Sequence, residues 1–373
     1  MSGAEQPIPY VDLSRQFDEE RDELLAIVTE ALARGDWVGG AAVGELERAL
    51  SEFHHGLEVV ALNSGTDALM LALKGLGIGR GDEVITPANS FIASTAAVVH
   101  VGARPMLVDV LPDQNLDPVA VERAVTPRTK AIMPVHLTGR MGEMDALMAV
   151  AAAHGLKVIE DAAQSIGSTH RRRLAGTIGD AGAFSAHPLK NLNACGDAGF
   201  LVTRDGDMAA RLRRLRTHGM VDRNTVAEFG LVSRLDTLQA AILLMRLKRL
   251  PSVIERRRRN ARLYRDLLDA AHVFIPAERE EAFDTYHTFV IQVERRDELQ
   301  AHLAAQGIGT GIHYPVPIHL QPAAAHLGYG QGDFPAVEAQ ARRILTLPVN
   351  QFMKPDDIAR VARAVNGFFG GVR

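Results

Sequence analysis

The sequence predicts an α/β fold: a large domain with a mostly parallel seven-stranded sheet between helices, and a smaller α+β domain at the C-terminal end. Two observations carry this prediction. Between residues 59 and 202, seven short apolar runs alternate with amphipathic helical patterns, which is typical of strands buried on both faces. The chain also has 373 residues, enough for a large domain and a smaller one.

The first element is an N-terminal helical segment, which we place at residues 1–35. Residues 14–34 have helical spacing, with Ser14 in position to cap the helix and apolar side chains at Leu24, Leu25, Ile27 and Val28. The glycines of "GDWVGG" then interrupt the pattern. The large domain is expected to begin there and to span residues 36–250.

The seven expected strands are short and apolar. They are the runs 59–62, 83–85, 106–108, 131–133, 157–159, 184–185 and 200–202. Amphipathic stretches between them, such as 66–76 and 142–154, are expected to be helices that cover the sheet. Because ligands of such sheets bind beyond the carboxyl ends of the strands, the residues just after each strand are the candidates for a site.

The C-terminal part begins with a strong helical pattern from Leu235 to about Ala271, in which Pro251 should end or kink a helix. We expect this stretch to connect to the smaller domain, residues 251–373. That domain contains the strand candidate "YHTFVIQV", a helix, "GIGTGIHYPVPIHLQP" and a terminal helix from residue 355. The basic run 256–259 is most simply a solvated helix face, and a functional anion site is the alternative.

Composition excludes several classes of protein. The net charge is −4, and charged residues make up 23% of the chain, so neither nucleic acid nor an anionic membrane is an expected partner. The single cysteine, Cys195, excludes an internal disulfide and a cysteine-based zinc site, and no metal is expected. The N-terminus is polar, and no apolar run approaches 18 residues. We therefore expect a cytoplasmic protein.

The first candidate for ligand binding follows the first strand, in "NSGTDAL". Ser64, Gly65 and Thr66 lie where a helix should begin, and a helix start offers free N–H groups and a positive dipole end. Glycine allows an anion to approach closely, so the stretch is a candidate phosphate cradle. The alternative is ordinary helix capping.

Two further candidates follow the second and fifth strands. Phe91, in "TPANSFIAS", could stack on a flat ligand ring, although core packing is the simpler interpretation. Asp161, in "IEDAAQSIG", follows an apolar run, and a buried carboxylate needs a partner such as a protonated pyridine nitrogen. Gln164 could reach the same ligand. A helix-capping role for Asp161 is the alternative.

The last candidate is Lys190 in "FSAHPLKNLNACGDAGF", with Ser185 five residues before it. The chain has six lysines and 35 arginines, so a retained lysine suggests an amine that attacks a carbonyl, although a surface lysine is the simpler interpretation of this stretch alone. Together the candidates comprise a phosphate cradle, a ring stacker, an acid for a ring nitrogen and an amine. That set matches the needs of pyridoxal phosphate.

The chain resembles the sugar aminotransferases of the DegT/DnrJ/EryC/StrS type, a branch of the fold type I pyridoxal phosphate enzymes that are similar to aspartate aminotransferase. The resemblance covers nearly the whole chain. It rests on "NSGTDALMLAL", "GDEVITPANSFIAS", "MLVDV", "AIMPVHLTGRMGEMDAL", "VIEDAAQSIGS", "FSAHPLKNLNACGDAGFLVT", "SRLDTLQAAIL" and "IGTGIHYPVPIHLQP".

The resemblance implies a role for each candidate. Lys190 bonds to the cofactor and then moves a proton between it and the substrate carbon, while Asp161 pairs with the pyridine nitrogen. Gln164 binds the ring hydroxyl and Phe91 stacks on the ring. The phosphate is held by Gly65, Thr66 and Ser185. The resemblance also implies a homodimer in which each active site includes residues of the partner.

One segment departs from the family pattern. The family usually has Gly-x-Asn-x-Arg before the long helix, and that Asn reaches the partner's phosphate. Here the stretch is "GLVSRL", so Val232 stands at the Asn position while Arg234 is kept. Valine cannot donate a hydrogen bond, which puts the contact across the dimer in doubt.

The resemblance implies transfer of an amino group from glutamate or glutamine to a keto group of a nucleotide-linked deoxysugar. "KNLNACGDAG" is closer to the segment of enzymes that aminate the third sugar carbon than to that of fourth-carbon enzymes, so a 3-keto sugar is favoured. The substrate-binding candidates, for which a structural loop is the alternative, are His187, Arg234, His313, Tyr314 and His319.

Other functions remain as alternatives or are excluded. The acceptor could be a cyclitol or another carbohydrate ketone, and the fold could serve a regulatory protein without turnover. Relatives that remove a hydroxyl replace the lysine with histidine, so Lys190 argues against them. The chain has no H-E-x-x-H or G-x-S-x-G motif of hydrolases and no G-x-G-x-x-G after the first strand, which argues against a dehydrogenase.

Overall fold

The structure is a computed structural model and describes residues 6–370. The helices are α1 Leu13–Arg34, α2 Ala41–Phe53, α3 Gly65–Gly75, α4 Ile92–His100, α5 Pro118–Ala124, α6 Met144–His154, α7 Gly206–Leu215, α8 Thr237–Leu267, α9 Arg296–Ala305, α10 Pro335–Arg343 and α11 Pro355–Gly370. The strands are β1 Glu58–Leu62, β2 Glu83–Pro87, β3 Arg104–Val108, β4 Thr129–Ile132, β5 Lys157–Asp161, β6 Thr169–His170, β7 Arg173–Leu174, β8 Ala181–Ser185, β9 Gly199–Thr203, β10 Val273–Phe274, β11 Ala282–Phe283, β12 Phe289–Val293 and β13 Ile344–Leu347.

The central sheet has seven strands in the order β1-β9-β8-β5-β4-β2-β3. The neighbours from β8 through to β3 pair in parallel, and only β9 runs antiparallel to both of its neighbours. This confirms the prediction of a mostly parallel seven-stranded sheet, since each of the seven apolar runs is one of its strands. The carboxyl ends of β1, β2, β5 and β8 therefore lie along one edge of the sheet.

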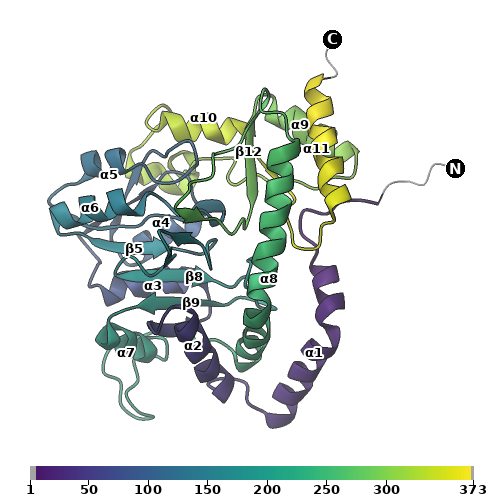
Figure 1. The fold of residues 1–373 in the computed structure, drawn as a ribbon. Helices are drawn as coiled ribbons and strands as arrows, with labels where there is room; N and C mark the ends of the chain where they lie inside the picture. Colours follow the sequence, from purple (N-terminus) through teal and green to yellow (C-terminus); the bar gives the residue numbers. More distant parts are fainter. Residues whose placement is uncertain (1–5, 371–373) are drawn as a thin grey trace.

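Helices cover both faces of this sheet (Figure 1). Residues of α2, α5, α6 and α8 form one core with Val59 and Ala61 of β1, while α3, α4 and α7 form a second core with Val60 and Leu62. Successive side chains of a strand point to opposite faces, so a strand between two helical layers must be apolar at every position. This explains why the sequence shows continuous apolar runs instead of alternation.

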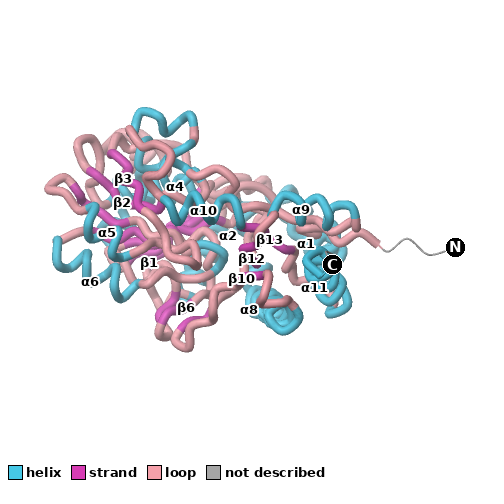
Figure 2. Tube along the Cα trace, turned by 90° about the horizontal axis from the view of Figure 1, so that it is seen from above, coloured by secondary structure: helices cyan, strands magenta, loops and turns pink. Residues whose placement is uncertain are grey.

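A second, smaller unit contains the three-stranded sheet β10-β12-β13 and helices α9 and α11. Figure 2 shows this unit beside the central sheet, and Figure 1 shows α8 running lengthwise beside it. Helix α8 joins the two, because Leu243 packs in the core of the large sheet and Tyr264 packs in the core of the smaller unit. Within residues 6–370, no helix combines the length and the apolar character that crossing a membrane requires.

One predicted helix cap is wrong, and one of the two outcomes predicted for Pro251 is excluded. Helix α1 is capped by Asp12, whose Oδ1 accepts from the N–H of Arg15 at 3.0 Å, and Ser14 lies in its first turn. Helix α8 continues through Pro251 instead of ending there. Leu250 and Ile254, on either side, are buried in the core, and this packing offsets the hydrogen bond that proline cannot make.

The solvated helix face predicted for residues 256–259 is also only partly correct. Arg259 is exposed and Arg256 and Arg258 are half-buried, but Arg257 is buried, with 6% of its surface exposed. The helical period turns one residue of such a run toward the interior, and charge alone does not reveal which one.

Glu160 of β5 connects the central sheet to the loop that follows β7. Its buried carboxylate accepts hydrogen bonds from His136 Nε2 at 2.9 Å and from the backbone N–H groups of Gly176, Ile178 and Gly179 at 2.9, 2.6 and 2.7 Å. Burial acts to raise the pKa of Glu160, but these hydrogen bonds and the nearby His136 outweigh it and lower the pKa below its usual value.

We expect Glu160→Ala to lower the free energy of unfolding by about 3–5 kcal/mol, because its partners would remain buried without an acceptor. Urea unfolding followed by circular dichroism would measure this. Since the folded pKa is lowered, the carboxylate's contribution exists above its unfolded pKa and disappears as the pH falls through the folded pKa. Glu122→Ala removes an exposed ion pair with His154 and should change stability far less. Equal stabilities of the two variants would contradict this role.

Candidate active site

A cleft of about 1150 Å³, including the space at its open mouth, lies beyond the carboxyl ends of β1, β5 and β8. Ten predicted site residues line it: Gly65, Thr66, Phe91, Asp161, Gln164, Ser185, His187, Lys190, His313 and Tyr314. Nearly 250 residues of chain separate the first from the last. The structure therefore brings together, at one edge of the sheet, the side chains that the strand ends indicated.

The N-terminus of α3 forms one end of the cleft. Ser64 caps this helix by accepting from the N–H of Asp67 at 3.1 Å, so the N–H groups of Gly65 and Thr66 belong to the turn that has no partner within the helix. Ser185 of β8 packs directly against Gly65, where an added Cβ would lie 2.8 Å from the Ser185 Cβ. The glycine thus lets the N-terminus of α3 pack closely against Ser185, so that free N–H groups and a hydroxyl lie side by side, as an anion site requires.

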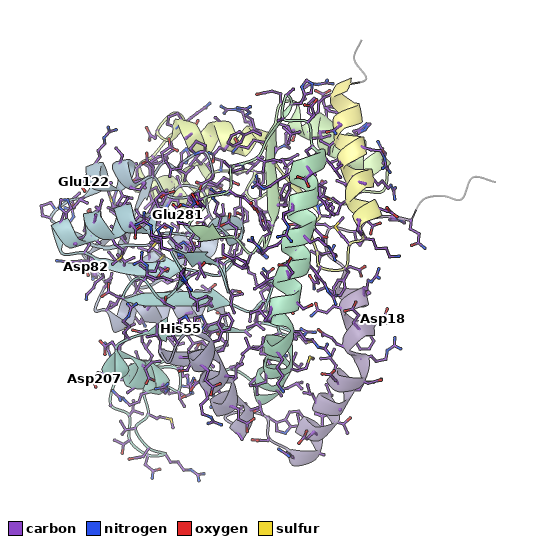
Figure 3. The ribbon with its side chains drawn as sticks, viewed as in Figure 1. Asp18, His55, Asp82, Glu122, Asp207 and Glu281 are labelled. Atoms are coloured by element: carbon purple, nitrogen blue, oxygen red, sulfur yellow. The ribbon has the colours of Figure 1, made fainter. Side chains whose placement is uncertain are left out.

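Asp161 ends β5 and is 4% exposed. Its Oδ2 accepts from Ser94 Oγ at 2.7 Å and its Oδ1 accepts from the N–H of Ala163 at 3.1 Å. Burial raises the pKa of Asp161, and these hydrogen bonds with the charge of Lys190 oppose the rise only in part. In contrast, acidic side chains such as Asp18 and Asp207 project outward at the periphery (Figure 3).

The opposite side of the cleft carries Phe91, Gln164 and Tyr314. The Phe91 and Tyr314 rings lie 5.9 Å apart, and Phe91 is 56% exposed, so it is not a core residue. Gln164 Oε1 accepts from the N–H of Thr138 at 2.8 Å, and its Nε2 donates to the Tyr314 hydroxyl at 3.3 Å. Exposed aromatic faces beside an oriented amide suit a flat, polar ring.

Lys190 lies in the turn after β8, where its N–H donates to the carbonyl of His187 at 2.8 Å. Burial lowers the pKa of the Lys190 amine to about 8, while the nearby Asp161 acts to raise it. A substantial fraction of this amine is therefore neutral near pH 8. A neutral amine has the lone pair that a nucleophile or a general base needs, which an arginine cannot supply at this pH.

Two histidines beside Lys190 stay neutral at physiological pH. Burial, followed by the charge of Lys190, lowers the pKa of His313 to about 4, and its Nδ1 lies 2.8 Å from Thr346 Oγ1. Burial, again followed by Lys190, lowers the pKa of His287 well below its usual value. Of these three side chains, only the Lys190 amine carries a positive charge at neutral pH.

Two predicted substrate-binding residues lie outside the cleft. His319 is buried in a separate core, with its Nε2 3.1 Å from Glu338 Oε1 and its ring against Phe334, so a place in the cleft wall is excluded. Arg234 is exposed and does not line the cleft of its own chain. Val232, at the usual Asn position, is 49% exposed.

Ser94 and His287 are the main cleft residues that the sequence interpretation missed. Ser94 lies within "TPANSFIAS", three residues after Phe91, and a serine beside a predicted aromatic carries no signal of its own. His287 lies in "YHTFVIQV", which the strand pattern dominates. Only the fold shows that this histidine reaches the cleft.

We expect Ser94→Ala to shift the acid limb of the pH–rate profile to higher pH. The Ser94 hydroxyl stabilises the carboxylate form of Asp161 and so lowers its pKa, and its loss would let burial raise that pKa further. At neutral pH the rate of the reaction catalysed in the cleft should fall roughly 5- to 10-fold. Ser90→Ala removes a nearby hydroxyl that donates to the Phe91 carbonyl instead, and it should leave the profile in place. Identical profiles for Ser94→Ala and the wild type would contradict this role.

The fold and the cleft are those of an aminotransferase. Helices cover both faces of the α/β sheet, and the strand ends carry an amine of lowered pKa and a buried carboxylate. The chain belongs to the DegT/DnrJ/EryC1/StrS aminotransferase family, whose pattern matches residues 18–366.

Two curated relatives match nearly the whole chain. The dTDP-3-amino-3,4,6-trideoxy-alpha-D-glucose transaminase of Streptomyces venezuelae is 42% identical over 367 residues, covering 98% of this chain and 97% of the relative. The pleiotropic regulatory protein of Geobacillus stearothermophilus is 39% identical over 366 residues, covering 97% and 98%.

Solved structures agree with the fold over the same extent. The S. venezuelae protein DesV, in complex with a ketimine intermediate, superposes with a TM-score of 0.94 at 41% identity, covering 97% of this chain and 98% of DesV. NtdA of Bacillus subtilis with bound cofactor PMP superposes with a TM-score of 0.89 at 33% identity, covering 98% of this chain and 86% of NtdA. The predicted fold class and family are thus confirmed.

Proposed function

We propose that this protein is a pyridoxal phosphate-dependent aminotransferase that moves an amino group from glutamate or glutamine to the keto group of a nucleotide-linked deoxysugar, with the ketone at the third sugar carbon. One observation carries the proposal: the Lys190 amine, with a pKa near 8, and the buried Asp161 carboxylate line one cleft at the sheet edge. The family membership of the chain supports the same reaction.

The cleft fits the cofactor at three points. The free N–H groups of Gly65 and Thr66, next to the Ser185 hydroxyl, form a cradle for a phosphate. Asp161 is a buried carboxylate with no lysine or arginine in ion-pair contact among the described residues, so a protonated ring nitrogen would supply the missing charge. Phe91 presents an exposed aromatic face to the ring.

When bound, pyridoxal phosphate supplies a carbonyl that captures amines and a ring that accepts electrons. Asp161 keeps the ring nitrogen protonated, and the donated hydrogen bond from Ser94 keeps Asp161 ionised and in place. In each half-reaction, Lys190 Nζ would take a proton from the carbon that loses the amine and deliver it to the carbon that gains the amine. The lowered pKa values of His287 and His313 make both imidazoles weak proton acceptors, so they do not compete for this proton.

The substrate class is supported by the relatives. The S. venezuelae relative is named as a transaminase for a 3-amino sugar linked to dTDP, and it is 42% identical to this chain. The segment after Lys190 favours the same position on the sugar. We place the sugar beside His187, His313 and Tyr314, which border the open side of the cleft.

We also propose a homodimer in which Arg234 reaches the partner's cleft. The loop after α7 projects from the large sheet (Figure 1) and leaves Phe229 99% exposed, with Val226 and Val232 about half exposed. Large apolar side chains exposed on one loop are typical of an interface.

We further propose that the chain divides into domains at residues 35 and 250, which leaves the cofactor cradle within the large domain. We also propose that the protein is cytoplasmic, because its single cysteine, Cys195, is exposed and suits a reducing compartment.

A regulatory protein without turnover is the second candidate, because the G. stearothermophilus relative carries that name. The retained Lys190 and Asp161 favour catalysis. To decide, the protein is purified with pyridoxal phosphate, and its absorbance between about 300 and 500 nm is recorded before and after glutamate or glutamine is added. A visible band that shifts to the ultraviolet supports the aminotransferase, and the converted protein is then tested against 3-keto and 4-keto nucleotide sugars and cyclitol ketones. A band that neither donor changes contradicts the proposal.

A further inference from the structure

The turn that carries Lys190 is tied to a buried polar network that the cleft does not include. Asn193, three residues after Lys190, is 6% exposed and does not line the cleft. Its Nδ2 donates to the carbonyl of Pro188 at 2.6 Å, while the N–H of Lys190 donates to the carbonyl of His187 at 2.8 Å. The amide of Asn193 therefore closes the turn across the residue that supplies the amine.

Two helices hold Asn193 in place. Arg246 of α8 donates from Nη1 to the backbone carbonyl of Asn193 at 2.9 Å and to its side-chain Oδ1 at 3.3 Å. The amides of Asn193 and of Gln16 in α1 exchange two hydrogen bonds of 3.0 Å. Both N–H groups and both lone pairs of the Asn193 side chain are thus used, which fixes the orientation of this amide.

The guanidinium of Arg246 is itself fixed by a buried carboxylate. Its Nε and Nη2 donate to Oε2 of Glu20 in α1 at 2.9 and 2.7 Å, and both residues are 7% exposed. Removing two charges from water is costly, so a buried pair of this kind often adds little to stability compared with apolar residues of the same size. Its two charge-assisted hydrogen bonds do restrict the geometry of both partners, and through Arg246 that restriction reaches Asn193.

Helix α1 joins the network through one face. Its buried residues are Gln16, Glu20 and Leu24, whose spacing of four places them along the same side of the helix. Leu24 packs in a small apolar cluster with α8, whereas Gln16 and Glu20 bond to Asn193 and Arg246. Figure 1 shows α1 on the side of α8 that faces away from the central sheet. The network therefore links an outlying helix to the active-site turn.

Packing alone leaves the Lys190 turn room to move. A narrow space behind the turn has walls that include Gln16, Pro188, Lys190 and Asn193. The open cleft lies on the other side of the amine. A turn with space on both sides has few packing contacts, so its position depends on its hydrogen bonds. A second tie, from Asn191 Nδ2 to the Thr285 carbonyl, is longer at 3.2 Å.

We infer that Asn193 is a positioning residue for the amine of Lys190, and that the Glu20–Arg246 pair holds it in this role. The inference rests on the proposed aminotransferase and extends its machinery to α1. With the turn fixed, the amine stays in the cleft with Asp161, where burial lowers its pKa to about 8. Without the tie, the turn shifts and the amine becomes better hydrated, so its pKa moves toward that of an ordinary lysine.

The first test measures the amine in the cofactor-free protein. Competitive labelling with acetic anhydride over a pH series, followed by peptide mass spectrometry, gives a pKa for each of the six lysines. Asn193→Ala should raise the pKa of Lys190 from about 8 to about 9, which lowers its neutral fraction at pH 7 about tenfold. The exposed Lys248 is the internal reference and should keep its pKa. The substitution leaves the surrounding charged groups in place: Asp12 and Arg257 behind the turn, and Asp161, Asp197 and three histidines in the cleft.

Asn260→Ala is the matched control. Asn260 is a fully buried amide of α8 that donates to the Asn350 carbonyl at 2.9 Å and bonds to no residue of the Lys190 turn. Both variants should lose a similar amount of stability in urea unfolding, but only Asn193→Ala should change the pKa of Lys190. With glutamate as donor, Asn193→Ala should lower kcat about tenfold and leave the KM within about twofold, whereas Asn260→Ala should keep both. If Asn193→Ala does not fold, Gln16→Met removes two hydrogen bonds to Asn193 from α1 and should raise the Lys190 pKa by a smaller amount.

The outcomes separate positioning from stability. An unchanged Lys190 pKa in Asn193→Ala refutes the positioning role even if activity falls. Equal pKa changes in Asn193→Ala and Asn260→Ala also refute it, because a general loosening of the fold then accounts for both. If the wild type converts no donor, the proposed aminotransferase fails, while the labelling result still decides the role of Asn193, since it needs neither cofactor nor turnover.

Discussion

Lys190→Ala is expected to reduce amino transfer by at least roughly 10⁴-fold, because it removes both the nucleophile and the proton carrier of the reaction. Among the residues lining the cleft, Lys190 supplies the only primary amine. The variant should also release pyridoxal phosphate on dialysis, which the wild type retains. Conversion of the cofactor by glutamate in single-turnover experiments measures the first effect, and absorbance after dialysis measures the second.

The fold should survive this substitution. The Lys190 side chain faces the cleft and lies in a turn instead of a packed core, so the melting temperature of the cofactor-free protein should change little. Lys248→Ala, on the exposed surface of α8, serves as the matched control and should retain wild-type activity. Substantial turnover by Lys190→Ala would assign the proton transfer to another group and remove the central element of the proposed mechanism.

Asp161→Asn should lower the rate of amino transfer by roughly 10²- to 10³-fold, the usual cost of removing one preorganised electrostatic group from an active site. The amide cannot carry the negative charge that keeps a ring nitrogen protonated. Its oxygen can still accept from the N–H of Ala163, and its NH₂ group can donate to the Ser94 hydroxyl. The geometry is therefore preserved while the charge is lost. Single-turnover rates with glutamate give the magnitude.

The pH dependence of the wild type provides a check on Asp161. Burial raises the pKa of Asp161, so its carboxylate becomes protonated at a higher pH than that of an ordinary aspartate. Activity should therefore decline on the acid side as Asp161 becomes protonated. Asp161→Asn should lose this acid limb. Asp18→Asn, at the exposed periphery, should keep both the rate and the limb. An acid limb that persists in Asp161→Asn would have to come from a different group.

Much of the site could be predicted because its residues follow strands. Each apolar run ends at a point that the periodicity locates within a residue or two, and parallel strands place their carboxyl ends at one edge. Gly65 and Asp161 were predicted as site residues in this way, whereas the phosphate-binding role of Ser185 was implied by the family resemblance. The order of the strands in the sheet was not predicted, because the residues of an apolar run do not indicate which other strands pair with it.

The prediction failed where a residue's partners come from distant parts of the chain. His319 shares a motif with His313 and Tyr314, yet it faces Glu338 in a separate core, because the short turn at 318–320 directs it away from the cleft. Pro251 breaks an isolated helix but not one whose flanking residues are packed in a core.

The sequence by itself determined the seven buried strands and the helical layers, and it predicted which residues supply the amine, the acid and the anion cradle, since these depend on local periodicity and on residue type. Only the tertiary structure decided which arginine of the run 256–259 is buried, that Ser94 fixes Asp161, and that His287 lies beside Lys190. These facts depend on contacts between segments far apart in the chain. Burial then sets the charge states on which the chemistry depends, because desolvation acts on a folded environment that no local pattern describes.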